Sequence, residues 1–261
     1  MSERGYLPGH GAASALMAQR RADRDAAFLA RHLRPGMRVL DCGCGPGTIT
    51  TGLAALIAPG DIVGIDLSEL EIARARTRAR RLGVDNAVFQ VGDAGALDFA
   101  DGTFDAVLFH GVLCHLEAPH RALAEACRVA RPGAVIGARE PIMRGDLFHP
   151  PDGLIAHMAA AYRQARARGP GDPDIGSRLR GLLGAVGLTD VTAGASYEAH
   201  ADARSLTEHF LPVVREHADR GTIDTALESD LDPVAATLAW TAAADSFFAR
   251  AWGEAVGFLP H

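Results

Sequence analysis

The chain has 261 residues, of which 48% are hydrophobic and 22% charged, so its composition predicts one globular domain with a sizeable core. The net charge is −6 and no basic run stands out, which argues against a nucleic-acid or membrane-surface partner. All 26 basic residues are arginine, which excludes Schiff-base chemistry, pyridoxal phosphate and the lysine-bearing phosphate loop of nucleotide hydrolases.

The four cysteines, Cys42, Cys44, Cys114 and Cys127, lie in apolar stretches of a chain without a signal-peptide pattern. We therefore expect buried, reduced thiols and a cytoplasmic protein. Cys42 and Cys44 are separated by a single residue, too close for the usual paired zinc ligands. No apolar run reaches the roughly 18 residues that a membrane-spanning helix needs, so we expect no membrane partner.

Strand-like and helical patterns alternate from residue 37 to residue 140, after a segment, 1–34, that we expect to form a helical cover. A Ser68–Glu71 capping box begins one helix, and Pro119 begins another. Pro-Gly pairs precede three of the strands. The expected strands are 37–42, 61–66, 86–91, 104–109 and 134–140. The helix that Pro119 begins is expected at 118–130, and a further helix is expected at 47–57.

Apolar strands separated by helices predict a doubly wound, Rossmann-like α/β fold with a parallel sheet covered on both faces. Ligands of such folds bind at the carboxyl ends of the strands. We therefore expect functional residues just after positions 42, 66, 92 and 109.

The first of these places is a glycine-rich turn, Asp41-Cys42-Gly43-Cys44-Gly45-Pro46-Gly47-Thr48. Glycines let the backbone approach a ligand that a Cβ atom would repel. The spacing G-x-G-x-G differs from the G-x-G-x-x-G of dinucleotide sites. Asp41 would repel a pyrophosphate but suits a ligand with a positive charge, such as a sulfonium or an ammonium.

Two further carboxylates follow the next strands. Asp66 stands about twenty residues beyond the glycines, where an acidic side chain binds the hydroxyls of a ribose. It could instead cap the following helix, but Ser68 already serves as the cap. Asp93, in Gly92-Asp93-Ala94, could accept from the amine of an adenine, although alone it is more typical of a turn. Together the three acids and the turn predict a cationic ligand that carries adenosine.

These motifs resemble the class I S-adenosylmethionine-dependent methyltransferases, in particular the small-molecule branch of ubiquinone and menaquinone methyltransferases. The resemblance covers about residues 36–140 and is carried by VLDCGCGPGT (39–48), VGIDLS (63–68), VGDAGALDF (91–99), FDAVLFHGVLCHL (104–116) and ARPGAVI (130–136). It implies S-adenosylmethionine as cofactor and S-adenosylhomocysteine as product. The expected cofactor contacts are Tyr6, Asp41, Gly43, Cys44, Gly45, Gly47, Asp66, Leu67, Gly92, Asp93, Ala94, His110 and Gly111.

The resemblance also implies a seven-stranded sheet that ends in an antiparallel hairpin, with the last strands near 188–198 and 247–256. The segment FFARAWGEAV in the second of these also scans as a helix. We expect one methyltransferase domain over 1–261, with the cofactor-binding core at 35–140 and helical cap insertions at 141–175 and 200–246. Tyr6 and His10 resemble lid contacts, but a packed N-terminal helix explains them almost as well.

Methyl transfer from a sulfonium is an in-line displacement that needs neither a metal nor a protein nucleophile, because its leaving group is already activated. A general base helps when the acceptor is a phenol, an alcohol or an acidic carbon. The candidates are His115, His110 and Glu140, which follow the fourth and fifth strands. His115 could instead hydrogen-bond the glycine turn, and His110 could form part of the cofactor wall. The spacing of His110, His115 and His120 matches no zinc signature, so no metal is expected.

The sequence therefore predicts a metal-independent methyltransferase acting on a small molecule, most simply in specialised metabolism. A peptide or protein acceptor stays open, as does the oligomeric state, with a homodimer as one option. The main rival uses the same fold without methyl transfer, as a cyclase or an accessory binding subunit. A short-chain oxidoreductase is the weaker rival, because its usual Tyr-x-x-x-Lys pair is impossible without lysine.

Overall fold

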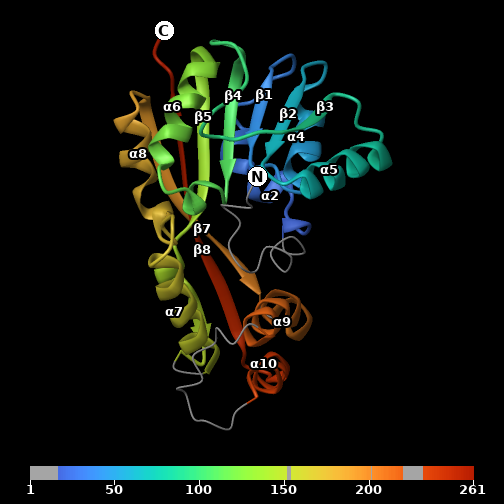
Figure 1. The fold of residues 1–261 in the computed structure, drawn as a ribbon, viewed down its shortest axis with the longest axis vertical. Coiled ribbons are helices and arrows are strands. Elements are labelled where there is room, and N and C mark those ends of the chain that lie inside the picture. Colours follow the sequence, from blue (N-terminus) through green and yellow to red (C-terminus); the bar gives the residue numbers. More distant parts are fainter. Residues whose placement is uncertain (1–16, 152–153, 201, 220–231) are drawn as a thin grey trace.

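The computed structural model describes residues 17–151, 154–200, 202–219 and 232–261. Its centre is an eight-stranded mixed sheet (Figure 1). The strands run in the order β3-β2-β1-β4-β5-β8-β6, and β7 pairs with β8. Their bounds are β1 Val39–Cys42, β2 Ile62–Asp66, β3 Ala87–Val91, β4 Phe104–His110, β5 Ala130–Pro141, β6 Leu147–His149, β7 Thr189–His200 and β8 Phe247–Phe258.

Strands β1 to β5 are parallel, as the alternation of strands and helices predicts. Neighbouring residues of a strand face opposite sides, and both sides are apolar here. Leu40 belongs to a core cluster shared with α6 (Pro119–Val129) and α8 (Leu179–Ala185). Val39 belongs to the cluster on the other face, shared with α4 (Thr48–Ile57). Burial on both faces explains the continuous apolar runs in the sequence.

The helix α5 (Glu69–Leu82) shows how local sequence sets an element's ends. The side chain of Ser68 accepts a hydrogen bond from the backbone N–H of Glu71, which confirms this part of the predicted capping box. Gly83 ends the helix in the left-handed region, and its N–H donates to the carbonyls of Ala79 and Arg80.

The structure corrects two expectations about the sheet and decides between two alternatives for a third. The sheet has eight strands and not seven, because the three-residue β6 joins β8 below the core. Pro132 and Gly133 lie inside β5 and not before it, since Ala130 already pairs with Phe104 and an irregularity follows. The segment FFARAWGEAV is strand β8, paired with both β5 and β7, so the helical alternative is wrong.

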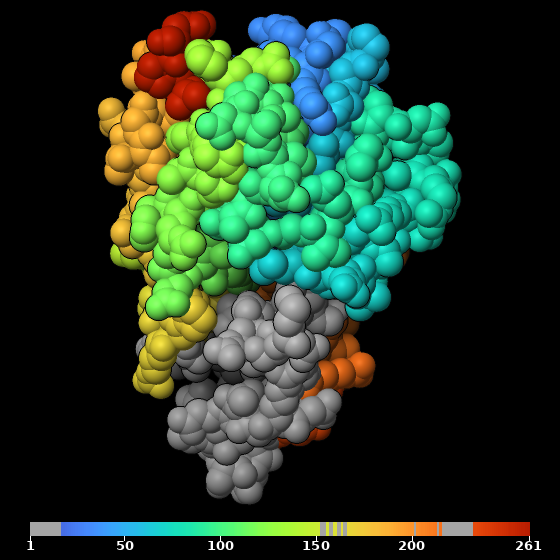
Figure 2. All heavy atoms as spheres, turned by 45° about the horizontal axis from the view of Figure 1, so that its top comes forward, coloured from blue at the N-terminus to red at the C-terminus, as the bar shows by residue number. Residues whose placement is uncertain are grey.

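Two segments that we expected to be insertions, 141–175 and 200–246, contribute the described elements below the parallel strands (Figure 1). The first contributes the short helix η2 (Met143–Gly145), β6, α7 (Leu154–Ala167) and the short helix η3 (Ile175–Arg178). The second contributes α9 (Ala203–Asp219) and α10 (Pro233–Ala242). In the space-filling view, yellow and orange residues of the insertions lie beneath the blue-to-green core (Figure 2). Strand β8 connects the two regions, since its first residues pair with β6 and its last residues pair with β5.

The described part of the N-terminal segment forms two four-residue helices, α2 (Ala22–Asp25) and α3 (Ala27–Ala30). Phe28 and Leu29 pack into the same cluster as α4, so this part packs on one face of the sheet. Tyr6 and His10 lie outside the described residues. Among the helices that the structure describes, none has both the length and the apolar character to span a membrane.

Candidate functional site

The glycine-rich turn leads from β1 directly into α4. Its first glycine, Gly43, has φ +73°, and a Cβ atom there would lie 2.3 Å from Cγ2 of Val112. Gly47 also has φ +73°, and its Cβ would lie 2.9 Å from Ala75 and Phe89. Both glycines are therefore required by packing as well as by backbone conformation. The N–H groups of Gly43 and Cys44 donate to the carbonyl of Ile65, which ties the turn to β2.

Asp41 lies at the end of β1, beneath this turn, with only 2% of its surface exposed. Its Oδ2 accepts a hydrogen bond of 2.6 Å from the hydroxyl of Thr50. Burial raises the pKa of Asp41 to about 6, and the nearby Asp66 raises it further, whereas the Thr50 hydrogen bond and the Arg20 guanidinium lower it. A buried carboxylate with few compensating contacts is stabilised by a positively charged ligand.

Asp66 lies at the end of β2 and binds backbone on two sides. Its Oδ2 accepts from the N–H of Gly45 at 3.0 Å, and its Oδ1 accepts from the N–H of Ser68 at 2.9 Å. The carboxylate of Asp66 and the hydroxyl of Ser68 therefore both accept backbone N–H groups at the start of α5. The carboxylate of Asp66 links the glycine turn to the start of α5, so it also fixes the shape of the site.

The residues expected around an adenine lie at the ends of β2 and β3. Asp93 is exposed, and its Oδ1 accepts from the N–H of Gly95 at 2.7 Å, which is an Asx turn. Gly92 is partly buried and Ala94 is buried. The side chain of Leu67 is half exposed. The N–H of Gly92 donates to the carbonyl of Asp66, so the two strand ends lie next to each other.

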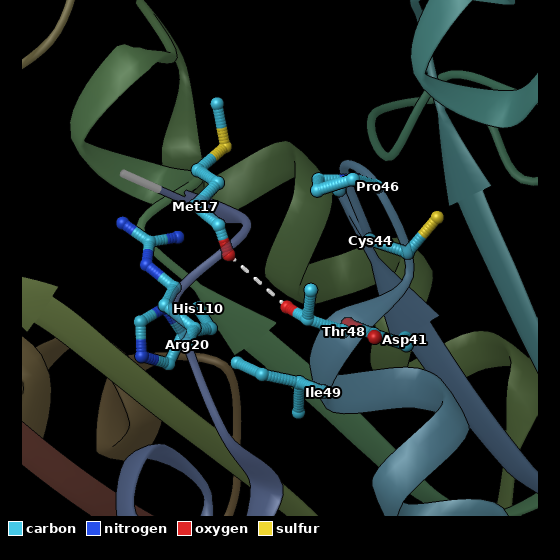
Figure 3. A pocket seen from close by; sticks show the side chains of 9 residues that line it. Met17, Arg20, Asp41, Cys44, Pro46, Thr48, Ile49 and His110 are labelled. Atoms are coloured by element: carbon cyan, nitrogen blue, oxygen red, sulfur yellow. Dashed lines mark hydrogen bonds between the residues drawn. The ribbon is translucent and has the colours of Figure 1, made fainter. Parts of the chain in front are cut away.

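A small cavity lies over the turn (Figure 3). Its volume is about 10 Å³, room for about one water molecule. Met17 and Arg20 cover it, and the hydroxyl of Thr48 donates to the carbonyl of Met17 at 3.1 Å. The lining residues within the described ranges are Met17, Arg20, Asp41, Gly43, Cys44, Pro46, Thr48, Ile49 and His110. A nucleoside would enter only after the side chains of Met17 and Arg20 move, because ligand pockets hold about 300 Å³ or more.

The end of β4 brings His110 and Gly111 to this cavity. His110 is buried, with 4% of its surface exposed, and its Nε2 lies 2.9 Å from Nη1 of Arg139. Gly111 has φ +64° and donates its N–H to the carbonyl of Arg139. Burial lowers the pKa of His110 well below its usual value, and the Arg20 and Arg139 guanidiniums lower it further. His110 is therefore neutral at pH 7.

Arg139 is a buried cation held by several partners. Its Nη1 contacts Asp25 at 3.2 Å and its Nε contacts Glu254 at 3.0 Å, and both contacts are ion pairs. Its guanidinium also stacks over the ring of Trp252, 4.4 Å from the centroid. This arrangement joins α2, β5 and β8 beside the cavity, so the cation is paired and hydrogen-bonded as burial requires.

Glu140 and His115, the other two base candidates, have different surroundings. Glu140 is fully buried, and its carboxylate accepts from the backbone N–H groups of Val112, Leu113 and Cys114 at 2.9 to 3.2 Å. It therefore holds the short helix η1 (Leu113–His115) and, among the described residues, is not one that lines the cavity. His115 is exposed, and its Nδ1 lies 3.2 Å from Nη2 of Arg166.

The structure gathers several predicted site residues at one edge of the sheet. Asp41, Gly43, Cys44 and His110 line the same cavity, while Gly45 and Gly47 lie in the turn but are not among its described lining residues. The sequence analysis missed Met17, Arg20, Arg139 and Trp252. A charged Arg139 inside an apolar strand was a signal for a buried polar cluster. Nothing in the sequence distinguished Arg20 from the other arginines.

A protein-family model described as a methyltransferase domain matches residues 33–165, about half of the chain. The chain belongs to the methyltransferase domain family. The resemblance to class I S-adenosylmethionine-dependent methyltransferases that the motifs indicate is confirmed. The matched region contains the glycine turn, the three carboxylates and the end of β4.

Two relatives illustrate the family. An uncharacterized methyltransferase of Schizosaccharomyces pombe is 32% identical over 161 residues, which cover 59% of this chain and 57% of the relative. The 27-O-demethylrifamycin SV methyltransferase of Amycolatopsis mediterranei is 36% identical over 132 residues, 49% of this chain and 47% of the relative. The chain thus spans about half the length of the curated relatives it matches.

Two solved structures share the fold. Phosphoethanolamine N-methyltransferase 2 of Haemonchus contortus, crystallised with S-adenosylhomocysteine, is similar with a TM-score of 0.63 and 16% identity, over 99% of this chain and 60% of that one. The [4+2]-cyclase SpnF is similar with a TM-score of 0.55 and 23% identity, over 95% of this chain and 80% of that one. At these identities the likeness shows the fold alone.

Proposed function

We propose that this protein transfers the methyl group of S-adenosylmethionine to a small-molecule acceptor by direct displacement, without a metal. One observation carries this proposal: within the family region, the glycine turn and the carboxylates Asp41 and Asp66 meet at one edge of the sheet. This set suits a cation attached to a ribose better than it suits a pyrophosphate.

The residues present fit this cofactor. Gly43 brings backbone without a side chain to the cavity, and the pKa of Asp41 stays raised by burial although Thr50 and the Arg20 guanidinium lower it, so a cation of the ligand would stabilise this carboxylate further. His110 adds a buried Nδ1 atom that has no hydrogen-bond partner in the described structure. We assign the methionine part to the neighbourhood of Asp41, Gly43 and His110 and the ribose to Asp66. The adenine would lie at the rim formed by Leu67, Gly92, Asp93 and Ala94.

When bound, S-adenosylmethionine supplies a methyl group on an activated leaving group. The protein's part is to align the acceptor and to exclude water. Met17 and Arg20 already cover the turn in the described structure, and they would close it again over a ligand. Glu140 fixes the backbone of residues 112–114, which lies next to the glycine turn through the Gly43–Val112 contact.

Among the three base candidates, we propose His115 for acceptors that must lose a proton. Its ring is exposed, while Glu140 is saturated by backbone N–H groups and His110 is buried between guanidiniums. Nδ1 of His115 faces the donor Nη2 of Arg166, so His115 could accept a proton from the acceptor only after this contact opens. An acceptor with a free lone pair would need no base.

We place the acceptor among the small molecules of specialised metabolism and the protein in the cytoplasm. A relative that is 36% identical is named as a methyltransferase of 27-O-demethylrifamycin SV, a small molecule, which supports this class of acceptor. The acidic balance of the chain argues against a nucleic acid.

Calorimetric titration tests the cofactor assignment. We expect both S-adenosylmethionine and S-adenosylhomocysteine to bind, and Asp66→Ala to weaken both by roughly 2 kcal/mol or more through lost charge-assisted hydrogen bonds. Because Asp66 also shapes the turn, the 2′-deoxy analogue of S-adenosylhomocysteine is the matched probe. The wild type should distinguish the two ligands and Asp66→Ala should not. Equal effects of the missing hydroxyl in both proteins would remove Asp66 from the ribose site.

Binding alone does not separate a methyltransferase from a protein that uses the same fold without methyl transfer. The [4+2]-cyclase SpnF has the same fold, so the fold alone does not separate the two functions. Conversion of S-adenosylmethionine to S-adenosylhomocysteine, measured with a panel of phenols, carboxylic acids and amines, tests the proposal. Acceptor-dependent conversion supports methyl transfer. Tight binding without conversion by any acceptor class favours the cyclase or accessory function.

A further inference from the structure

The contact between His110 and Arg139 determines where the histidine carries its proton. The two residues are paired neighbours at the ends of β4 and β5, and Nε2 of His110 lies 2.9 Å from Nη1 of Arg139. A guanidinium has donors and no acceptor. Nε2 must therefore accept this hydrogen bond. A neutral imidazole that accepts at Nε2 carries its single proton on Nδ1.

Arg139 is held so that this contact persists. Its guanidinium is 3% exposed and is fixed by Asp25, by Glu254 and by the face of Trp252. Asp25 lies in α2 and Glu254 in β8, so three elements of the fold orient the donor. The Asp25–Arg139–His110 chain thus runs from the N-terminal cover to the cavity.

The protonated atom of His110 is left without a partner. Nδ1 is buried and makes no hydrogen bond in the described structure. The backbone of His110 itself raises the pKa of the ring, but by less than burial, Arg20 and Arg139 lower it. His110 lines the cavity over the glycine turn, whereas Arg139 is not among the described residues that line it. A buried polar atom without a partner costs about 1 to 3 kcal/mol, which a ligand in the cavity would recover.

A second donor faces the same cavity. Arg20 lines it beside His110 (Figure 3). The guanidinium of Arg20 lies 5.5 Å from the ring centroid of Trp252 and against Gly111, and within the described ranges it makes no hydrogen bond or ion pair. An N–H group and an unpaired guanidinium at one cavity form a site for an anionic oxygen.

We propose that Arg139 holds His110 as the neutral tautomer with its proton on Nδ1, and that this N–H and the Arg20 guanidinium together bind an anionic oxygen of the ligand. This inference rests on the proposed function. The oxygen belongs either to the carboxylate of the cofactor or to an acceptor that binds already ionised. His110 then acts as a hydrogen-bond donor and not as a general base.

The tautomer is measured directly by nitrogen-15 NMR of histidine-labelled protein, with His110→Asn used to assign the signal. We expect the signal of a neutral imidazole protonated at Nδ1, unchanged between about pH 6 and 8. The guanidiniums of Arg20, Arg139 and Arg24 act on this ring, and Asp25 and Glu254 are paired with Arg139. Arg139→Lys should keep a donor and preserve the signal. Arg139→Met should allow the proton to exchange between the two nitrogens.

Ligand binding tests the second half of the proposal. His110→Asn keeps an N–H near the position of Nδ1, His110→Leu removes it, and His120→Leu is the matched control at an exposed histidine of α6. The probes are S-adenosylhomocysteine, 5′-methylthioadenosine, which lacks the carboxylate, and 4-nitrophenolate added to the S-adenosylhomocysteine complex. We expect His110→Leu to weaken an anionic probe by roughly tenfold or more, and His110→Asn to restore most of the loss.

The pattern of losses identifies the source of the anion. A loss for S-adenosylhomocysteine but not for 5′-methylthioadenosine assigns the cofactor carboxylate, and a loss for 4-nitrophenolate alone assigns the acceptor. A proton on Nε2, a doubly protonated ring, or equal binding of all probes by wild type and His110→Leu overturns the proposal. If the wild type binds no S-adenosylhomocysteine at all, the proposed function itself fails, which is a separate result. The NMR measurement on the wild type decides the tautomer even if His110→Leu does not fold.

Discussion

The pKa of Asp41 makes a quantitative prediction about stability. Burial raises this pKa to about 6 from its ordinary value of 3.8, so between these pH values the folded protein holds a proton that the unfolded chain has lost. The folded state therefore loses stability as the pH rises through about 6. About two pH units at 1.36 kcal/mol each give a cost of at most about 3 kcal/mol at pH 7.5.

Asp41→Asn removes this cost, because asparagine does not ionise and its oxygen still accepts from Thr50. The stability difference between Asp41→Asn and the wild type should grow by about 2 kcal/mol from pH 4.5 to pH 7.5, where the cost is nearly complete. Urea denaturation at a series of pH values measures it. Asp98→Asn, at an exposed aspartate, is the control and should show no such growth.

The same substitution should harm binding. S-adenosylmethionine carries one more positive charge than S-adenosylhomocysteine, so Asp41→Asn should weaken the first ligand more than the second. Calorimetry with both ligands at pH 7.5 measures the difference. A pH-independent stability difference would show that the pKa of Asp41 is not raised in the folded state. Equal losses for the two ligands would show that Asp41 does not stabilise the positive charge of S-adenosylmethionine.

Two further predictions concern the backbone around the site. Glu140→Gln replaces a carboxylate that accepts from three N–H groups by an amide with one acceptor oxygen, so it should lower the free energy of unfolding by about 2 to 4 kcal/mol in urea denaturation. Glu117→Gln, at an exposed position, should change it little. Gly43→Ala should weaken S-adenosylhomocysteine binding, because its Cβ would meet Val112 at 2.3 Å. Adding Val112→Ala should restore part of the affinity, and no recovery would indicate that backbone strain at φ +73° dominates.

The sequence predicted the parallel half of the fold well because its elements are defined locally. The Ser68 cap, Pro119 at a helix start and the apolar strands each determine an element within a few residues. Strand β6 could not be predicted, because its three residues are a strand only through pairing with β8. The prediction that Pro132 and Gly133 precede the strand was wrong for a similar reason. Pairing of Ala130 with Phe104 makes β5 begin before them.

The sequence predicted those site residues that lie directly at the ends of predicted strands. Asp41 and Asp66 lie at strand ends, and the strand order alone brings them together. Arg20, Arg139 and Trp252 meet through contacts between α2, β5 and β8, which are far apart in the sequence. Likewise the three N–H partners of Glu140 became visible only in three dimensions, and they turn a base candidate into a structural anchor.

Strand β8 has a consequence for how such a protein can diversify. Its last residues are hydrogen-bonded to β5 in the core, and its first residues carry β6 and pack against Phe210 of α9. Strand β8 is therefore one continuous element that joins the parallel part of the sheet to the insertions. We therefore expect changes in the insertions at one end of β8 to leave the β5–β8 pairing at its other end in place.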